Sequence, residues 1–185
     1  MSSGLAMMNK KVFLSYYSTF SQRAYDQINH DILRQNLKCV IGLDRSGIVG
    51  EDGQTHQGIY DLSIFNPLDC YICNPYNQNE IDSILEYAYS NNCDKTVFLR
   101  FPRGYIENNN LSNIKEITKP SWYYFNKTNN AKICFISYGS NLNIFNNVKN
   151  NLNLDIDIIN ALFIKPLDNN FINEIFDKYD YIFTL

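Results

Sequence analysis

Apolar runs of five to seven residues alternate along this chain with longer segments whose apolar residues recur at helical spacing. The runs predict buried strands and the periodic segments predict amphipathic helices. The predicted strands are Lys11–Tyr17, Cys39–Leu43, Asp69–Cys73, Thr96–Phe101, Lys132–Tyr138, Asp155–Ile159 and Tyr181–Leu185. The predicted helices are Phe20–Gln35, Asn77–Asn92, Leu142–Leu152 and Pro166–Lys178, the last capped by Asp168.

This alternation predicts an α/β fold in which parallel sheets carry helices on both faces. We expect two α/β units, residues 11–104 and 131–185, joined by a connector over 105–130 that has little periodicity and contains some strand. Residues 1–10 begin with the patternless MSSGLAMM and are expected to be a tag or a disordered end. Each unit offers few strands and the chain stops inside an apolar run, so the sequence predicts a fragment of a larger polypeptide.

Composition excludes several classes of function. The chain has 16 Lys+Arg against 19 Asp+Glu and no basic run, which argues against a nucleic-acid surface. No apolar run approaches the roughly 20 residues of a membrane span. Five cysteines, an odd number in a long chain, argue against a secreted disulfide scaffold. The 27 asparagines indicate an AT-rich codon bias. Gly, Arg, His and Asp, which this bias does not explain, are therefore the better candidates for functional residues.

Such residues lie where the predicted strands end. In open α/β sheets, ligands bind beyond the carboxyl ends of the strands, so these residues are expected to share one edge. They are Tyr17 and Phe20 after the first strand, Arg45, Asp52 and His56 after the second, and Arg100 and Arg103 at the strand 96–101.

The segment 44–58 (DRSGIVGEDGQTHQG) is the most informative, because its four glycines permit positive φ and close approach to a ligand. Arg45 is suited to hold a phosphate through two hydrogen bonds. Asp52 and His56 could form an imidazole oriented by a carboxylate for proton transfer. In the alternative interpretation the aspartates only make Asx turns and His56 is a packing residue.

Other patterns predict no further chemistry. The glycine spacing matches neither a dinucleotide fingerprint nor a phosphate-binding P-loop. Cys70 and Cys73 lie across a predicted strand, so their side chains are expected on opposite faces rather than around a metal. No metal site is predicted from these residues.

Several motifs resemble one known family. YSTFSQRAYDQ (17–27), DRSGIVGEDGQTHQG (44–58) and RFPRG (100–104) resemble 1-deoxy-D-xylulose-5-phosphate synthases of the transketolase superfamily. SYGS (137–140) and FIKPLD (163–168) resemble the start of that family's C-terminal domain. The resemblance implies most of a transketolase-like pyrimidine-binding domain followed by a partial transketolase C-terminal domain.

The resemblance also implies a reaction and a cofactor. Members of the family join pyruvate to D-glyceraldehyde 3-phosphate with loss of CO2, which gives 1-deoxy-D-xylulose 5-phosphate for the non-mevalonate isoprenoid pathway and for thiamine and pyridoxal. They use thiamine diphosphate with Mg2+ and act as homodimers. Tyr17 and Phe20 would then pack against the aminopyrimidine ring of the cofactor.

Five further residues would face the substrates. Arg45 and Arg103 would clamp the phosphate of the aldehyde, which suits two cations around a dianion. Arg23 would contact the substrate from the first turn of its helix. Asp52 and His56 would line the site, orient substrate and assist proton transfer.

Two elements of the family pattern are expected outside this chain, namely the catalytic glutamate and the diphosphate-and-Mg2+ motif. We therefore expect the isolated 185 residues neither to turn over nor to bind thiamine diphosphate tightly. The alternatives are another pyrimidine domain of the superfamily, from a transketolase or a 2-oxo-acid dehydrogenase β-subunit, and a non-catalytic dimerisation module. Composition and pathway together suggest a plastid-type organelle such as an apicoplast, or the cytoplasm if the source is bacterial.

Overall fold

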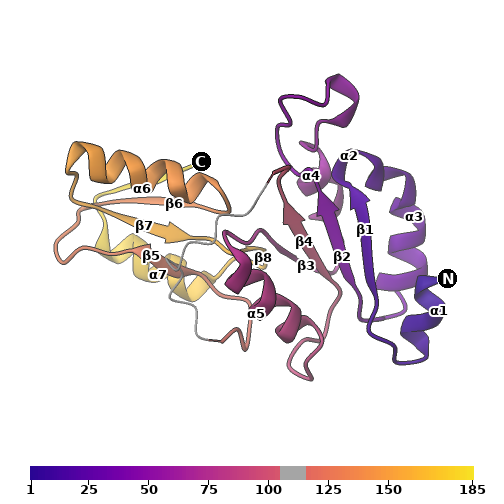
Figure 1. The fold of residues 1–185 in the computed structure, drawn as a ribbon. Coiled ribbons are helices and arrows are strands. Elements are labelled where there is room, and N and C mark those ends of the chain that lie inside the picture. Colours follow the sequence, from indigo (N-terminus) through magenta and orange to yellow (C-terminus); the bar gives the residue numbers. More distant parts are fainter. Residues whose placement is uncertain (105–115) are drawn as a thin grey trace.

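The computed structural model describes residues 1–104 and 116–185, which form two α/β units built on two sheets (Figure 1). The first sheet has the strand order β1-β2-β4-β3-β8. Its first four strands in that order run parallel, and β8 is antiparallel to β3. The bounds are β1 (Phe13–Tyr17), β2 (Val40–Asp44), β4 (Val97–Phe101), β3 (Tyr71–Cys73) and β8 (Phe163–Lys165).

Apolar side chains bury both faces of this sheet. In β4, Phe98 faces one apolar cluster while Val97 and Leu99 face the other, as the two-residue period of a strand requires. The first cluster includes Ile28 and Phe65, and the second includes Ile84 of α5. The helical segments are α1 (Ser2–Met7), α2 (Ser18–Ser21), η1 (Gln22–Ala24), α3 (Tyr25–Gln27), η2 (Ile28–Leu33), η3 (Gln54–His56), α4 (Asp61–Phe65) and α5 (Gln78–Ala88).

The second sheet has the order β5-β7-β6-β9, with β6 parallel to both of its neighbours and β5 antiparallel to β7. Adjacent residues of β7 serve its two faces: Ile158 joins the cluster of Leu142 in α6, and Ile159 joins that of Ile175 in α7. Figure 1 shows these two helices on opposite faces of the sheet. The bounds are β5 (Tyr123–Asn126), β6 (Ile133–Ser137), α6 (Asn141–Leu152), β7 (Ile156–Asn160), α7 (Asn169–Lys178) and β9 (Tyr181–Thr184).

The α/β class is confirmed, with several departures in detail. The expected tag-like end is instead the helix α1, whose Ala6 is buried in the core. The predicted helix 20–35 is helical over 18–33 but contains 3-10 and π turns. The sheets are mixed rather than purely parallel, because the short strands β5 and β8 add antiparallel edges. Asp168 caps α7 as predicted, accepting from Phe171 N at 3.1 Å.

The two units are linked across the connector. Of the predicted connector 105–130, residues 105–115 lie outside the described residues, and Tyr123–Asn126 forms β5 of the second sheet. Conversely, β8 comes from the C-terminal part of the chain but pairs with β3 at the edge of the first sheet. No helix among residues 1–104 and 116–185 is both long and apolar enough to cross a bilayer.

A buried carboxyl group ties α5 to the second sheet. Glu80 is fully buried and accepts hydrogen bonds from the Tyr76 N–H at 2.7 Å, the Asn160 amide at 3.2 Å and the Tyr123 hydroxyl. Burial raises the pKa of Glu80, and these three donors offset part of that rise. Because Tyr123 lies in β5 and Asn160 in β7, the carboxyl group joins both units.

A second buried pair supports the start of the loop that follows β2. Arg100 of β4 donates to Asp61 through Nε at 2.8 Å and through Nη2 at 3.1 Å, and both side chains are almost completely buried. Asp61 also accepts from the Ser46 hydroxyl at 2.9 Å. Arg100, expected at the open edge of the sheet, is therefore a buried structural residue.

We expect the stability difference between Glu80→Gln and the wild type to depend on pH. A carboxyl group whose pKa is raised on folding binds its proton more tightly in the folded state, so the wild type loses stability as pH rises above about 4.3. The uncharged glutamine avoids that loss, and the variant should gain stability relative to the wild type between about pH 5 and pH 8. Urea denaturation at both pH values measures the difference. Exposed Glu86→Gln on the same helix is the control, and an equal difference at both pH values would contradict the expectation.

We expect Asp61→Asn to lower the free energy of unfolding by about 3–5 kcal/mol, because it leaves the Arg100 guanidinium buried without its counter-charge. The double variant Asp61→Leu with Arg100→Met should show a smaller decrease in the free energy of unfolding, since neither charge then remains buried. Denaturant unfolding measures both, and the exposed carboxylate of Asp82 supplies the control Asp82→Asn. A single variant as stable as the control would show that the pair has no structural role.

Candidate functional site

Three parallel strands end level with one another. The register pairs Tyr17 with Asp44 and Asp44 with Phe101, so β1, β2 and β4 finish at one edge of the first sheet. The Ser46 N–H bonds the Phe101 carbonyl at 3.0 Å and extends this alignment into the loop. The segments that begin at residues 18, 45 and 102 therefore start side by side, as the sequence predicts.

The loop after β2 is closed at its base. Gly47 and Gly58 exchange backbone hydrogen bonds of 2.7 and 2.9 Å. A Cβ at Gly58 would collide with the Arg45 carbonyl oxygen and with Ser18, so only glycine fits there. The loop is thus fixed directly against the start of α2.

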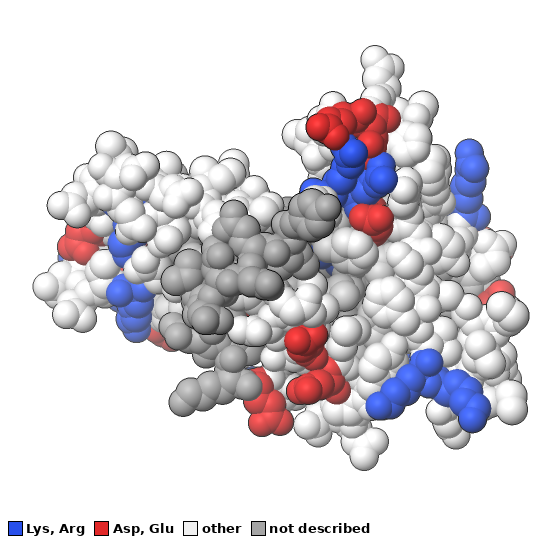
Figure 2. Space-filling model, in the orientation of Figure 1, with Lys and Arg blue, Asp and Glu red and all other residues white. Residues whose placement is uncertain are grey.

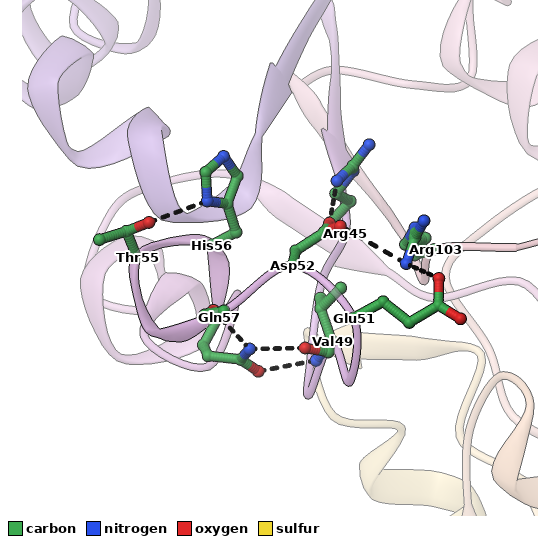
Figure 3. Close-up of polar contacts among 9 residues, drawn as sticks. Arg45, Val49, Glu51, Asp52, Thr55, His56, Gln57 and Arg103 are labelled. Carbon is green, nitrogen blue, oxygen red and sulfur yellow. Dashed lines mark hydrogen bonds and ion pairs between the residues drawn. The ribbon is translucent and has the colours of Figure 1, made fainter.

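One side chain braces the loop from inside. Gln57 accepts from the Val49 N–H at 2.7 Å and donates to the Val49 and Gly53 carbonyls at 2.6 and 2.9 Å (Figure 3). Gly53 has φ of 72°, a conformation that favours glycine. These contacts fix the backbone on both sides of Glu51 and Asp52.

Asp52 brings the two candidate phosphate-binding arginines together. Arg45 forms an ion pair with one oxygen of Asp52, and Arg103 lies 3.4 Å from the other (Figure 3). The Asp52 side chain is only 13% exposed. Arg45 has φ of 58°, which is uncommon for a residue with a side chain, and its guanidinium lies 4.2 Å from the Tyr17 ring centroid. The two cations therefore converge, as the sequence predicts.

An aromatic group lies next to these charges. Tyr17 and Phe20 stack with centroids 6.0 Å apart and 14° between the ring planes. The His56 ring meets Phe20 edge-on at 5.2 Å and Tyr17 at 6.0 Å. Arg23 lies 5.6 Å from the Phe20 ring centroid. All seven predicted site residues thus belong to one connected cluster.

The predicted pairing of Asp52 with His56 is wrong. Asp52 is directed at the two arginines, and Figure 3 shows the imidazole turned away from it. The hydrogen bond at His56 Nδ1 is instead made with the Thr55 hydroxyl at 2.9 Å. The Thr55 carbonyl in turn accepts from the Thr19 hydroxyl at 3.2 Å, which joins the loop to α2. Two guanidinium groups close to a partly buried carboxylate form charge-assisted hydrogen bonds with it and leave the imidazole to another partner.

Three further residues of the cluster were not predicted from the sequence. Glu51 bonds Arg103 at 2.5 Å, Thr55 bonds the imidazole, and Gln57 braces the loop. All three lie within the segment 44–58, next to Asp52 or His56, and this proximity in the sequence could have indicated them.

The cysteines take no part in the site. Cys70 and Cys73 pack into the clusters on opposite faces of the first sheet, as predicted. Burial raises the pKa of the Cys70 thiol to about 12 and also raises that of Cys73. Among the described residues, no three His, Cys, Asp or Glu side chains gather as a metal centre would require.

An open depression of about 570 Å³ adjoins the arginines. It is lined by Ile48, Val49, Gly50, Glu51, Arg103 and Gly104. Figure 2 shows acidic and basic side chains in contact beside the loop that projects at the top of the view. The arrangement offers two guanidinium groups for an anion, a partly exposed aromatic pair for a flat ring, and an imidazole beside that pair.

Comparisons with known proteins agree with this geometry. A family model described as the transketolase pyrimidine-binding domain matches residues 1–108. The 1-deoxy-D-xylulose-5-phosphate synthase of Clostridium tetani is 39% identical over this whole chain, and that of Campylobacter hominis is 35% identical over 98% of it. This chain spans about 30% of the length of each.

Solved structures show the same fold. A split-gene transketolase, described as an inactive β4 tetramer, matches 99% of this chain and 59% of its own with a TM-score of 0.80 at 19% identity. A transketolase mutant from Pichia stipitis matches all of this chain and 28% of its own with a TM-score of 0.81 at 16% identity. With the family match over residues 1–108, the chain belongs to the family of transketolase pyrimidine-binding domains, and throughout its length it is similar to 1-deoxy-D-xylulose-5-phosphate synthases.

Proposed function

We propose that this chain supplies one wall of the active site of a thiamine-diphosphate-dependent transferase that makes 1-deoxy-D-xylulose 5-phosphate. The reaction joins pyruvate to D-glyceraldehyde 3-phosphate with loss of CO2. The observation that carries the proposal is the convergence of two arginines, a stacked aromatic pair and a histidine at one edge of the first sheet. The names of the relatives support the same reaction.

The two arginines suit the phosphorylated substrate. Arg45 and Arg103 both contact Asp52, so their guanidinium groups are held near each other before substrate binds. A phosphate dianion accepts paired, charge-assisted hydrogen bonds from such groups. Arg45 and Arg103 thus bind the phosphate of the aldehyde, and Arg23, beside Phe20, contacts the substrate from η1.

The aromatic pair fits the cofactor. Tyr17 and Phe20 are stacked and only partly buried, which leaves ring surface for a flat heterocycle such as the aminopyrimidine. When bound, thiamine diphosphate supplies the nucleophilic carbon and the electron sink for decarboxylation. In the proposed assignment this chain holds the aminopyrimidine, while the diphosphate and Mg2+ are held by polypeptide outside it.

The histidine suits proton transfer to the reacting aldehyde oxygen. Its Nδ1 is engaged with the Thr55 hydroxyl, and its ring packs edge-on against Phe20 and Tyr17. Fixing one ring nitrogen sets the direction of the other, which is left to donate or accept a proton at the substrate. Asp52 acts on substrate indirectly, by holding both arginines in place.

The assembly and location are also proposals. We propose a homodimer for the full-length enzyme by analogy with the family. A plastid-type organelle remains a prediction from the Asn-rich composition, and the similar proteins named above are from bacteria.

In the full-length enzyme, Arg45→Ala should lower kcat/KM by about 2–4 kcal/mol in transition-state free energy, because one arm of the phosphate clamp is lost. The loss should fall on the phosphorylated aldehyde and spare the KM of pyruvate. Steady-state kinetics with each substrate varied measure this, with exposed Arg34→Ala as the control. An effect confined to pyruvate would refute the assignment.

His56→Ala in the same enzyme should lower kcat by about 100-fold or more, since general acid–base groups contribute on that scale. Its thermal midpoint should stay close to that of the wild type, because the ring is only partly buried. The exposed His30→Ala is the matched control. If the variant loses stability while its kinetics hold, His56 is a packing residue.

A further inference from the structure

Arg103 is paired with two carboxylates that differ in burial. Asp52 is 13% exposed and is shared with Arg45, so it belongs to the fixed part of the cluster. Glu51 lies 2.5 Å from the Arg103 guanidinium, yet its side chain is 82% exposed. Among the described residues, Arg103 is the one hydrogen-bond and ion-pair partner of the Glu51 side chain. The Arg103 guanidinium thus has one fixed partner, Asp52, and one exchangeable partner, Glu51.

We propose that Glu51 is an internal competitor for the anion that Arg103 binds, so that its carboxylate occupies the guanidinium until a phosphate displaces it. This inference rests on the proposed function, because it takes the aldehyde's phosphate as the displacing group. It assigns Glu51 the role of a residue that lowers the affinity of Arg103 for anions, so that an anion must make further contacts with the site to displace it.

The position of the pair supports displacement. Glu51 and Arg103 both line the open depression of about 570 Å³, so an anion entering there meets Arg103 with the Glu51 carboxylate already on it. A dianion held beside that carboxylate would be repelled by it. The approach of phosphate to Arg103 therefore requires Glu51 to turn away.

The movement needed is confined to one side chain. Val49, two residues before Glu51, is fixed by both hydrogen bonds to Gln57, and the Gly53 carbonyl, two residues after it, is fixed by a third. The backbone thus stays in place while the exposed Glu51 side chain rotates into solvent. The loop need not open for the site to be filled.

The balance of charges still allows phosphate to bind. An exposed ion pair of this kind changes an equilibrium constant by about fivefold at most, so its loss is a small penalty. Phosphate offsets the loss of the Glu51–Arg103 ion pair by forming several charge-assisted hydrogen bonds to two arginines. A monoanionic carboxylate only replaces Glu51 with another group of equal charge and gains little.

The test compares the full-length wild-type enzyme with Glu51→Gln by calorimetric titration with inorganic phosphate. The variant should bind phosphate about two- to fivefold more tightly, and the gain should shrink as salt screens the exposed pair. In kinetics, the KM for D-glyceraldehyde 3-phosphate should fall by a similar factor while that for pyruvate is unchanged. Glu86→Gln, which removes the same charge from an exposed position on α5, is the control.

The outcomes separate this inference from the proposed function. Phosphate affinity in Glu51→Gln equal to that in Glu86→Gln, or weaker than in the wild type, would overturn the competitor role alone. Arg103→Gln should reduce phosphate affinity in every background; if it does not, both the clamp and the competitor are wrong. An enzyme that binds phosphate through Arg103 but does not make 1-deoxy-D-xylulose 5-phosphate would overturn the proposed reaction and leave the role of Glu51 to be decided by the titrations.

Discussion

The level ending of three parallel strands is the constraint on which the site depends. Tyr17, Asp44 and Phe101 share one row of the first sheet, so the segments that follow them leave the sheet together. Had β2 been displaced along its neighbours, Arg45 would lie away from Tyr17 and from the turn that carries Arg103. Burial of both faces of the sheet fixes that register, because a shift of one residue would move Ile41, Phe98 and their neighbours to the wrong face.

After the strands end, two carboxylates position the arginine side chains, one in the buried interior and one near the surface. Asp61 is fully buried and binds Arg100 together with the Ser46 hydroxyl, which secures the first turn of the loop. Asp52 lies nearer the surface and holds Arg45 and Arg103 toward each other. The deeper pair is structural because no anion can reach it, and the shallower set remains accessible to ligand. The same residue types thus serve stability or binding according to how far solvent reaches them.

The sequence predicts those elements of the fold whose own residues specify them. β2, β4, α5 and α7 carry clear apolar periods or a capping aspartate, and they form within a few residues of the expected bounds. The elements that it misses depend on distant partners. β8 is three residues long and is defined by pairing with β3, nearly a hundred residues earlier. α1 looks patternless because it buries chiefly one small side chain, Ala6, which offers little contrast in hydropathy.

For the site, residue chemistry identified the members but not the pairings. The seven predicted residues do form one cluster, because strand ends in a parallel sheet determine which segments meet. The spacing of Asp52 and His56 suggested a carboxylate–imidazole pair, whereas the loop, closed at Gly47 and Gly58 and braced by Gln57, points them apart. A four-residue spacing carries meaning on a helix, where it defines a face, but in an irregular loop the direction of each side chain depends on individual backbone bonds. The partners of Asp52 followed from charge, since two guanidinium groups lay within its reach.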